Sequence, residues 1–232
     1  MTEGWCVMKP LKIAVAKGRL EEETLALMEK AGMDCSGAED KGRKLILPID
    51  QGRLQLVLAK AADIVTYVEH GVCDMGVVGK DTIMESAQSL YEVMDLGFGR
   101  CRIMLAAYQD MDFYQGFGVK TVATKYPNIA RGFFERKAMD VNIVKIEGSV
   151  ELAPLLGLAD GIVDIVETGG TLKANGLEEK ELIAHLSARL VVNVASMKMR
   201  KTEIEAVISR LRDAGAEAGL TEGAVKAVLA GA

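Results

Sequence analysis

Short apolar runs and amphipathic segments alternate along the whole chain. Apolar runs bounded by turn residues predict buried strands, and segments with apolar residues three or four positions apart predict helices. The predicted strands are residues 12–16, 45–47, 54–58, 74–78, 90–96, 101–107, 119–123, 141–146, 162–166 and 190–194. Strands interleaved with helices, with no internal repeat and no Pro- or Gly-rich linker, indicate an α/β fold.

Several predicted helices have a recognisable start, stop or apolar face. The first begins near Leu20 and stops at Gly32, and another has Asp63 as its N-cap and stops at Gly71. Ser149 is predicted to be the N-cap of a further helix. The tail contains two amphipathic helices, whose apolar stripes are Ile204, Val207, Ile208 and Leu211 in the first and Val225, Val228 and Leu229 in the second.

Composition narrows the class of protein. Half of the 232 residues are hydrophobic, and the formal net charge of −5 argues against a nucleic-acid-binding protein. The four cysteines lie far apart without a CxxC pair, which predicts reduced thiols in a cytoplasmic protein. No apolar run approaches the ~20 residues of a membrane span. Residues 1–10 lack the regions of a signal peptide, and Met8 is an alternative start.

Residues 160–176 hold the clearest candidate chemistry. A predicted strand, residues 162–166, is followed by Thr168-Gly169-Gly170-Thr171 and then by a segment that can start a helix. This order points backbone N–H groups at an anion, and the glycines let it approach because no Cβ intrudes. Threonine hydroxyls add further donors. The stretch therefore predicts a cradle for a phosphate group.

Two carboxylates beside this cradle, Asp164 and Glu167, indicate what the phosphate carries. Carboxylates accept hydrogen bonds from ribose hydroxyls, and they also hold Mg²⁺ together with substrate phosphates. We therefore predict a ribose-5-phosphate pocket. The alternative is a strand followed by an ordinary Gly-Gly turn, which is a common feature. The acids and threonines around the glycines favour the pocket.

Cations and glycines also follow other predicted strands. Lys17-Gly18-Arg19 follows residues 12–16, where ligands bind in open α/β sheets, although the two cations could also be an ordinary solvated surface pair. Gly79 ends the strand at 74–78. A helix start at Ser149 would offer a second place for phosphate, besides its plain role as an N-cap.

These motifs together resemble one family. The residues that carry the resemblance are 17–20, 43–45, 67–71, 74–81, 148–154 and 160–176, in family order. They resemble the ATP phosphoribosyltransferases, which catalyse the first step of histidine biosynthesis. The resemblance implies two lobes of the type II periplasmic-binding-protein kind joined by two crossing strands. The first lobe would be residues 1–102 plus 192–232, and the second 103–191.

The resemblance also implies substrates, partners and residue roles. Adenine N1 of ATP would attack C1 of phosphoribosyl pyrophosphate (PRPP), with Mg²⁺ bound to both substrates and held in part by Asp164 and Glu167. The length suggests the short form, which works with a separate regulatory subunit resembling histidyl-tRNA synthetase, and a homodimer is expected. The implied catalytic cations are Arg19, Arg43 and Lys60. The implied substrate-binding residues are Lys17, Gly18, Gly79, Ser149, Asp164, Glu167, Thr168, Gly169, Gly170 and Thr171.

Two questions stay open at this level. Family members commonly have Arg where this chain has Lys60, and Lys cannot make the bidentate phosphate contact of Arg, so Arg53 is an alternative cation. A non-enzymatic two-lobe protein that binds or senses small anions is the rival function, and another phosphoribosyltransferase is a third. Binding of both ATP and PRPP would distinguish the prediction from both rivals.

Overall fold

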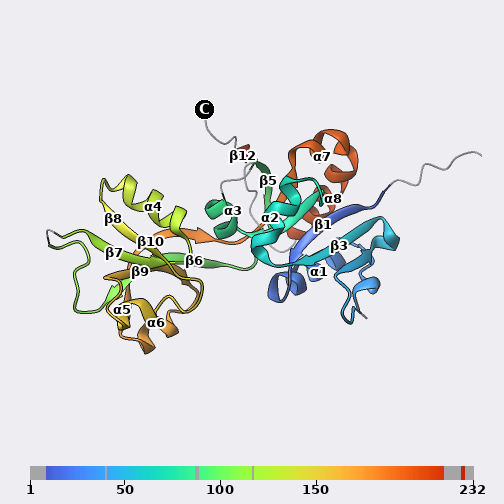
Figure 1. The fold of residues 1–232 in the computed structure, drawn as a ribbon. Coiled ribbons are helices and arrows are strands. Elements are labelled where there is room, and N and C mark those ends of the chain that lie inside the picture. Colours follow the sequence, from blue (N-terminus) through green and yellow to red (C-terminus); the bar gives the residue numbers. More distant parts are fainter. Residues whose placement is uncertain (1–8, 40, 87–88, 117, 217–225, 228–232) are drawn as a thin grey trace, which may run out of the picture. The chain divides into compact units, whose positions relative to one another are not determined.

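A computed structural model describes residues 9–39, 41–86, 89–116, 118–216 and 226–227 of the chain. The chain divides into two compact units, which are described separately (Figure 1). The first unit consists of Met1–Thr82, Ala87–Gly99 and Ala188–Ala232, and the second of Ile83–Ser86 and Arg100–Ser187. The lobe boundaries expected from the sequence stay a prediction.

The first unit is built on a mixed sheet with the strand order β12-β5-β11-β4-β1-β3-β2. Strand β1 is parallel to both of its neighbours, β3 and β4, and the other pairs are antiparallel. Its strands are β1 (Leu11–Ala16), β2 (Ile46–Ile49), β3 (Leu54–Ala59), β4 (Met75–Gly79), β5 (Leu90–Asp95), β11 (Ala188–Asn193) and β12 (Lys226–Ala227).

Helices pack against this sheet, and the three longer ones each bury an apolar stripe. They are α1 (Arg19–Lys30), α2 (Ala61–Glu69), α7 (Val194–Met199) and α8 (Lys201–Ala216), with short 3₁₀ turns at Ser36–Ala38 and Asp50–Gly52. Helix α1 ends before Gly32, whose φ of 71° only glycine adopts without strain. The stripe predicted for the first tail helix is confirmed, because Ile204, Val207, Ile208 and Leu211 are all buried in α8.

The second unit is a five-stranded sheet with the order β10-β6-β9-β7-β8, in which β7, β8 and β9 are parallel. Its strands are β6 (Cys101–Tyr108), β7 (Lys120–Thr124), β8 (Val141–Lys145), β9 (Gly161–Val166) and β10 (Leu177–Leu186). Helix α4 (Pro127–Arg136) covers one face, and α5 (Leu152–Leu155) and α6 (Gly170–Ala174) cover the other (Figure 1). The alternation along β6 serves both cores: Ile103 and Leu105 pack on the α4 side, and Met104 and Ala106 on the α5 and α6 side.

Helix α3 (Lys80–Ser86) begins in the first unit and ends in the second. The carboxylate of Glu85 accepts hydrogen bonds from the backbone N–H groups of Asn128 and Ile129, at 3.0 and 3.1 Å. These N–H groups belong to the first turn of α4, which has no intrahelical acceptors for them. Glu85 therefore caps α4 from another element. Among the described residues, no helix combines the length and apolar surface that crossing a membrane requires.

The α/β class is confirmed, and three local predictions are corrected. Strand β10 was not predicted, because the charged run in residues 178–181 hides its alternation. Helix α2 begins at Ala61 with Lys60 as N-cap, so Asp63 lies in its first turn. Helix α5 begins at Leu152 with Glu151 as N-cap, so Ser149 precedes it in a turn. The second tail helix falls largely outside the described residues, where Val225, Val228 and Leu229 lie, and Lys226–Ala227 is a strand.

One buried glycine in β4 allows α2 to approach the sheet. A Cβ on Gly76 would lie 2.8 Å from Ile64 Cγ2 and 2.9 Å from Val68 Cγ2. We expect Gly76→Ala to lower the free energy of unfolding by about 1–3 kcal/mol, because overpacking displaces the helix. Urea unfolding measures this change. The control is Gly118→Ala, where a Cβ meets no atom within 4 Å and the expected change stays within about 0.5 kcal/mol. Equal stability of the two variants would contradict the packing argument.

Candidate active site

A pocket of about 300 Å³ lies in the second unit, where β9 leads into α6. It is lined by Glu151, Asp164, Ile165, Val166, Glu167, Thr168, Gly169, Gly170, Thr171 and Leu172. Six of these residues, Asp164 and residues 167–171, were predicted as site residues, and the pocket brings them together. The other four, Glu151, Ile165, Val166 and Leu172, were not predicted. We call residues 167–171 the glycine turn.

The backbone of the glycine turn depends on Gly169. Its φ of 76° is in the left-handed region, and it is the N-cap of α6. A Cβ there would also lie 3.1 Å from Glu179 Oε1, so a side chain would strain the backbone and require Glu179 to shift slightly. The first N–H groups of α6 have no acceptor within the helix and border the pocket. The turn is therefore suited to hold an anion.

Asp164 lies on the face of the sheet that α5 and α6 cover. It pairs with Met104 on the neighbouring strand β6 and is half-buried. Burial raises the pKa of its carboxyl, and the negative charge of Glu151 adds to this, whereas the N–H of Ile165 and the charge of Lys125 oppose it. A half-buried carboxylate beside an anion cradle favours a ligand that brings its own hydroxyl donors.

Glu151 was not predicted as a site residue. A signal was present, because Glu151 follows β8, and the parallel strands β7, β8 and β9 all end at one edge of the sheet. The loops after parallel strands carry ligand sites in such sheets. Lys125 follows β7 and therefore lies at the same edge. The predicted residue Ser149 is exposed and its carbonyl accepts a hydrogen bond from Leu152 N at 3.3 Å, but it does not line the pocket.

The predicted cations gather at one edge of the other sheet, in the first unit. Ala16 pairs with Ala59, and Lys17 N donates to Ala59 O at 3.2 Å, so Lys17 and Lys60 follow neighbouring strand ends. Arg43 also lies near this edge. Leu45, two residues after Arg43, accepts a hydrogen bond from Leu58 N at 2.8 Å, close to the end of β3. We call this set the basic edge, and its members are Lys17, Gly18, Arg19, Arg43, Lys60 and Gly79.

The cations of the basic edge differ in whether they have an ion-pair partner. Arg19 Nε donates to Glu23 at 3.0 Å, one turn along α1. The side chains of Lys17, Arg43 and Lys60 are exposed, and within the described part of the chain they have no ion-pair partner. Gly18, with a φ of 91°, lets the chain turn sharply between β1 and α1. Three cations are therefore available to a phosphorylated ligand.

Arg53 does not belong to the basic edge. It precedes β3, whereas Lys60 follows it, so the two cations lie at opposite ends of one strand. Arg53 pairs with the buried carboxylate of Asp50 at 3.1 Å, and Asp50 also pairs with Arg210 at 3.0 Å. Lys60, and not Arg53, therefore lies at the strand end beside Lys17, and the role of Lys60 as the cation that completes a substrate site stays a prediction.

The fold and these two strand edges define a class, a two-unit α/β protein with candidate anion-binding loops after its parallel strands. Within this class, residues 60–213 match the family model described as ATP phosphoribosyltransferase. The chain belongs to the ATP phosphoribosyltransferase family.

Relatives and solved structures agree with this assignment. The ATP phosphoribosyltransferase of Clostridium kluyveri is 56% identical over 204 residues, which cover 88% of this chain and 93% of the relative. That of Listeria monocytogenes serotype 4a is 54% identical over 207 residues, covering 89% and 97%. A solved ATP phosphoribosyl transferase (HisG:HisZ) complex from Thermotoga maritima matches with a TM-score of 0.77 and 32% identity, covering 89% of this chain and 99% of that one.

One further match concerns the fold alone. The periplasmic aliphatic sulphonate binding protein SsuA from Escherichia coli has a TM-score of 0.57 at 12% identity, covering 90% of this chain and 69% of that one. The predicted likeness to two-lobe periplasmic binding proteins is thus confirmed.

The raised pKa of Asp164 has a consequence for stability. Because the folded pKa lies above the unfolded one, the carboxyl stabilises the fold when protonated, and this contribution is lost as the pH rises through the folded pKa. We therefore expect Asp164→Asn to raise Tm at pH 7, with a gain that disappears as the pH falls to about 4. Thermal unfolding across this range measures it. Asp160→Asn is the control, because Asp160 Oδ2 accepts from Thr121 N at 2.7 Å and should not gain stability. A lower Tm for Asp164→Asn at pH 7 would contradict the argument.

Proposed function

We propose that this chain transfers the phosphoribosyl group of PRPP to N1 of the adenine of ATP, giving phosphoribosyl-ATP and pyrophosphate. The observation that carries the proposal is the single pocket that joins the glycine turn to the carboxylates of Asp164 and Glu167. Membership of the ATP phosphoribosyltransferase family supports the same reaction. A purely ligand-binding function is not favoured, because the binding protein SsuA resembles this chain in fold alone.

The reaction forms a bond between adenine N1 and C1 of the ribose and breaks the bond between C1 and the pyrophosphate oxygen. The transition state carries positive charge on the ribose and growing negative charge on the leaving group. Catalysis therefore requires rigid placement of the ribose and cations near the pyrophosphate. No side chain has to act as a nucleophile.

In this proposal the glycine turn holds the 5-phosphate. Backbone N–H groups at the start of α6 and the hydroxyls of Thr168 and Thr171 donate to its oxygens. Asp164 and Glu167 accept hydrogen bonds from the ribose hydroxyls, which fixes C1 relative to the phosphate. Desolvation of Asp164 makes its charge more effective, because nearby water screens it less.

The basic edge supplies the charges for the other phosphates. Lys17, Arg43 and Lys60 are exposed cations, and Arg19 adds a fourth through a guanidinium that its neighbour Glu23 orients. Gly18, where a Cβ would meet no atom within 4 Å, permits close approach of phosphate oxygens to the backbone, whereas the carboxylate of Asp81 fills the corresponding space at Gly79. Lysine acts here as a compact point charge, which tolerates movement of the leaving group better than a fixed bidentate contact does.

Mg²⁺ bound to the substrate phosphates would supply additional positive charge to the leaving group. Within the residues that the structure describes, no three His, Cys, Asp or Glu side chains form a metal cage. Mg²⁺ commonly takes one or two carboxylates together with substrate phosphates. Asp164 and Glu167 are two of the three carboxylates that line the pocket, beside Glu151, and would provide those oxygens.

We also propose a cytoplasmic hetero-oligomer. The solved relative from Thermotoga maritima is named as a HisG:HisZ complex, which supports a separate regulatory subunit, resembling histidyl-tRNA synthetase, for this chain. A homodimer stays a prediction. Three described cysteines, Cys35, Cys73 and Cys101, are free thiols, which suits a reducing compartment.

Direct assay tests the function. Purified chain with ATP, PRPP, Mg²⁺ and pyrophosphatase is expected to form phosphoribosyl-ATP, followed by its ultraviolet absorbance, and to need both substrates. The same assay with the regulatory subunit added shows whether that subunit is required. Folded protein that makes no product under either condition, yet binds a small anion, would favour the binding-protein alternative.

A matched pair of lysine and arginine variants tests the basic edge. Lys60→Ala is expected to lower kcat/KM by at least about tenfold, because it removes a charge from the leaving-group side. Arg53→Ala removes a cation at the other end of β3 and should change kcat/KM by less than about twofold, since Asp50 keeps its partner Arg210. Equal losses in the two variants would remove Lys60 from the proposed site.

A further inference from the structure

Two charged side chains lie against the glycine turn without lining the pocket. Oε1 of Glu179, on β10, is 3.1 Å from the point where a Cβ on Gly169 would lie. Arg102, on β6, donates from Nη2 to the same oxygen at 2.6 Å. The pair is roughly one-third exposed, with 38% of the Arg102 side chain and 29% of the Glu179 side chain accessible. An ion pair therefore backs the residue on which the turn depends.

Strand register explains how Arg102 comes to this place. Arg102 lies opposite Val166, the last residue of β9, directly before the glycine turn begins. It alternates with Ile103 and so shares a face with Met104 and Ala106, which pack on the α5 and α6 side. Its side chain therefore emerges on the face where the glycine turn and α6 lie.

Strand register also places Glu179 on this face, because it alternates regularly with Leu177, which packs on the α5 and α6 side, and a β-bulge follows it. Glu179 pairs with Ala106 and Glu181 with Leu105, so Lys180 is an extra residue in β10. In a regular strand Glu179 and Glu181 would face the same side. Here Glu181 instead lies on the α4 side, where Lys137 Nζ is 2.7 Å from its Oε1. Bulges near active sites commonly re-aim a side chain in this way.

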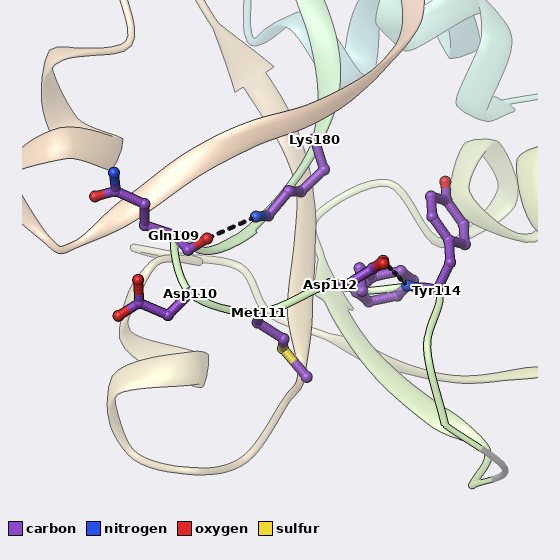
Figure 2. Close-up of a pocket in the computed structure, with 7 residues that line it drawn as sticks. Gln109, Asp110, Met111, Asp112, Tyr114 and Lys180 are labelled. Atoms are coloured by element: carbon purple, nitrogen blue, oxygen red, sulfur yellow. Dashed lines mark hydrogen bonds between the residues drawn. The ribbon is translucent and has the colours of Figure 1, made fainter.

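The bulge residue itself is held elsewhere. Figure 2 shows Lys180 directed at the loop that follows β6, where its Nζ donates to the carbonyl of Gln109 at 3.2 Å. It also pairs with Glu178 at 2.6 Å. These two contacts hold the side chain of the bulge residue.

We propose that Glu179 and Arg102 are a positioning pair for the glycine turn. The carboxylate of Glu179 occupies the space behind Gly169 and supports its left-handed backbone, which directs the N–H groups of the turn at the phosphate. Arg102 neutralises that carboxylate, which would otherwise repel the phosphate. The buried Nε of Arg102 has no hydrogen-bond partner among the described residues, and such a group is costly to keep. A need for positive charge at this point accounts for it. The inference rests on the proposed function.

A double-mutant cycle tests the charge argument. Arg102→Met leaves an unpaired carboxylate behind the turn, and we expect it to raise KM for PRPP about fivefold while KM for ATP changes less than about twofold. The double variant Arg102→Met with Glu179→Gln removes both charges, and about half of the loss, on a logarithmic scale, should be recovered. Arg102→Lys keeps the charge and should stay within about twofold of the parent.

The matched control is the pair across the bulge. Lys137→Met and Glu181→Gln remove an ion pair of similar length and exposure on the opposite face, and neither should change KM for PRPP by more than about twofold. If Arg102→Met and the double variant raise KM equally, or if the control pair has the same effect, the positioning role is wrong.

A second measurement is independent of activity. Hydrogen exchange of the amides of residues 168–172 in the ligand-free protein should be faster in Arg102→Met than in the parent and in Lys137→Met. Unchanged exchange overturns the proposal even if the enzyme is active. Conversely, if the parent makes no phosphoribosyl-ATP, the proposed function fails, and faster exchange confined to Arg102→Met would still support the role of the pair in holding the turn.

Discussion

Parallel strand pairing is the constraint on which the candidate site depends. In the first unit β1 lies between β3 and β4, and in the second β7 lies between β8 and β9, all in parallel. Parallel strands end at the same edge of a sheet, so the loops that follow them are neighbours although they are far apart in sequence. This geometry collects Lys17, Lys60 and Gly79 in one unit, and Lys125, Glu151 and the glycine turn in the other.

The two edges carry opposite charge, and this division matches the proposed chemistry. Ribose hydroxyls are hydrogen-bond donors and suit carboxylates, whereas pyrophosphate and ATP phosphates require cations. The carboxylates in the second unit lower the stability of the fold, because burial makes the ionised form of Asp164 unfavourable. A charge kept at such a cost is a mark of function more often than of stability.

The glycine turn illustrates how a local motif depends on distant support. Gly169 permits the left-handed backbone, but a carboxylate from β10 occupies the space behind it, and a guanidinium from β6 neutralises that carboxylate. Regular alternation from Leu177 places Glu179 on this face, and the bulge at Lys180 turns Glu181 to the other face. Three strands thus contribute to one short turn, which explains how its amide groups can be held rigidly before a ligand binds.

By itself, the sequence determined the α/β class, most of the strands and helices, and the glycine turn between Asp164 and Thr171. These features are local, because apolar periodicity and a glycine pair bounded by acids are visible within a short window. Tertiary structure alone decided the rest. Strand β10 was hidden by its charges, and Arg53 and Lys60 proved to lie at opposite ends of β3. Glu151 joins the pocket from the loop after β8, and Arg102 and Glu179 lie against the glycine turn from β6 and β10. The physical reason is that strand order and register place these residues, and neither is recorded in the local pattern of any single strand.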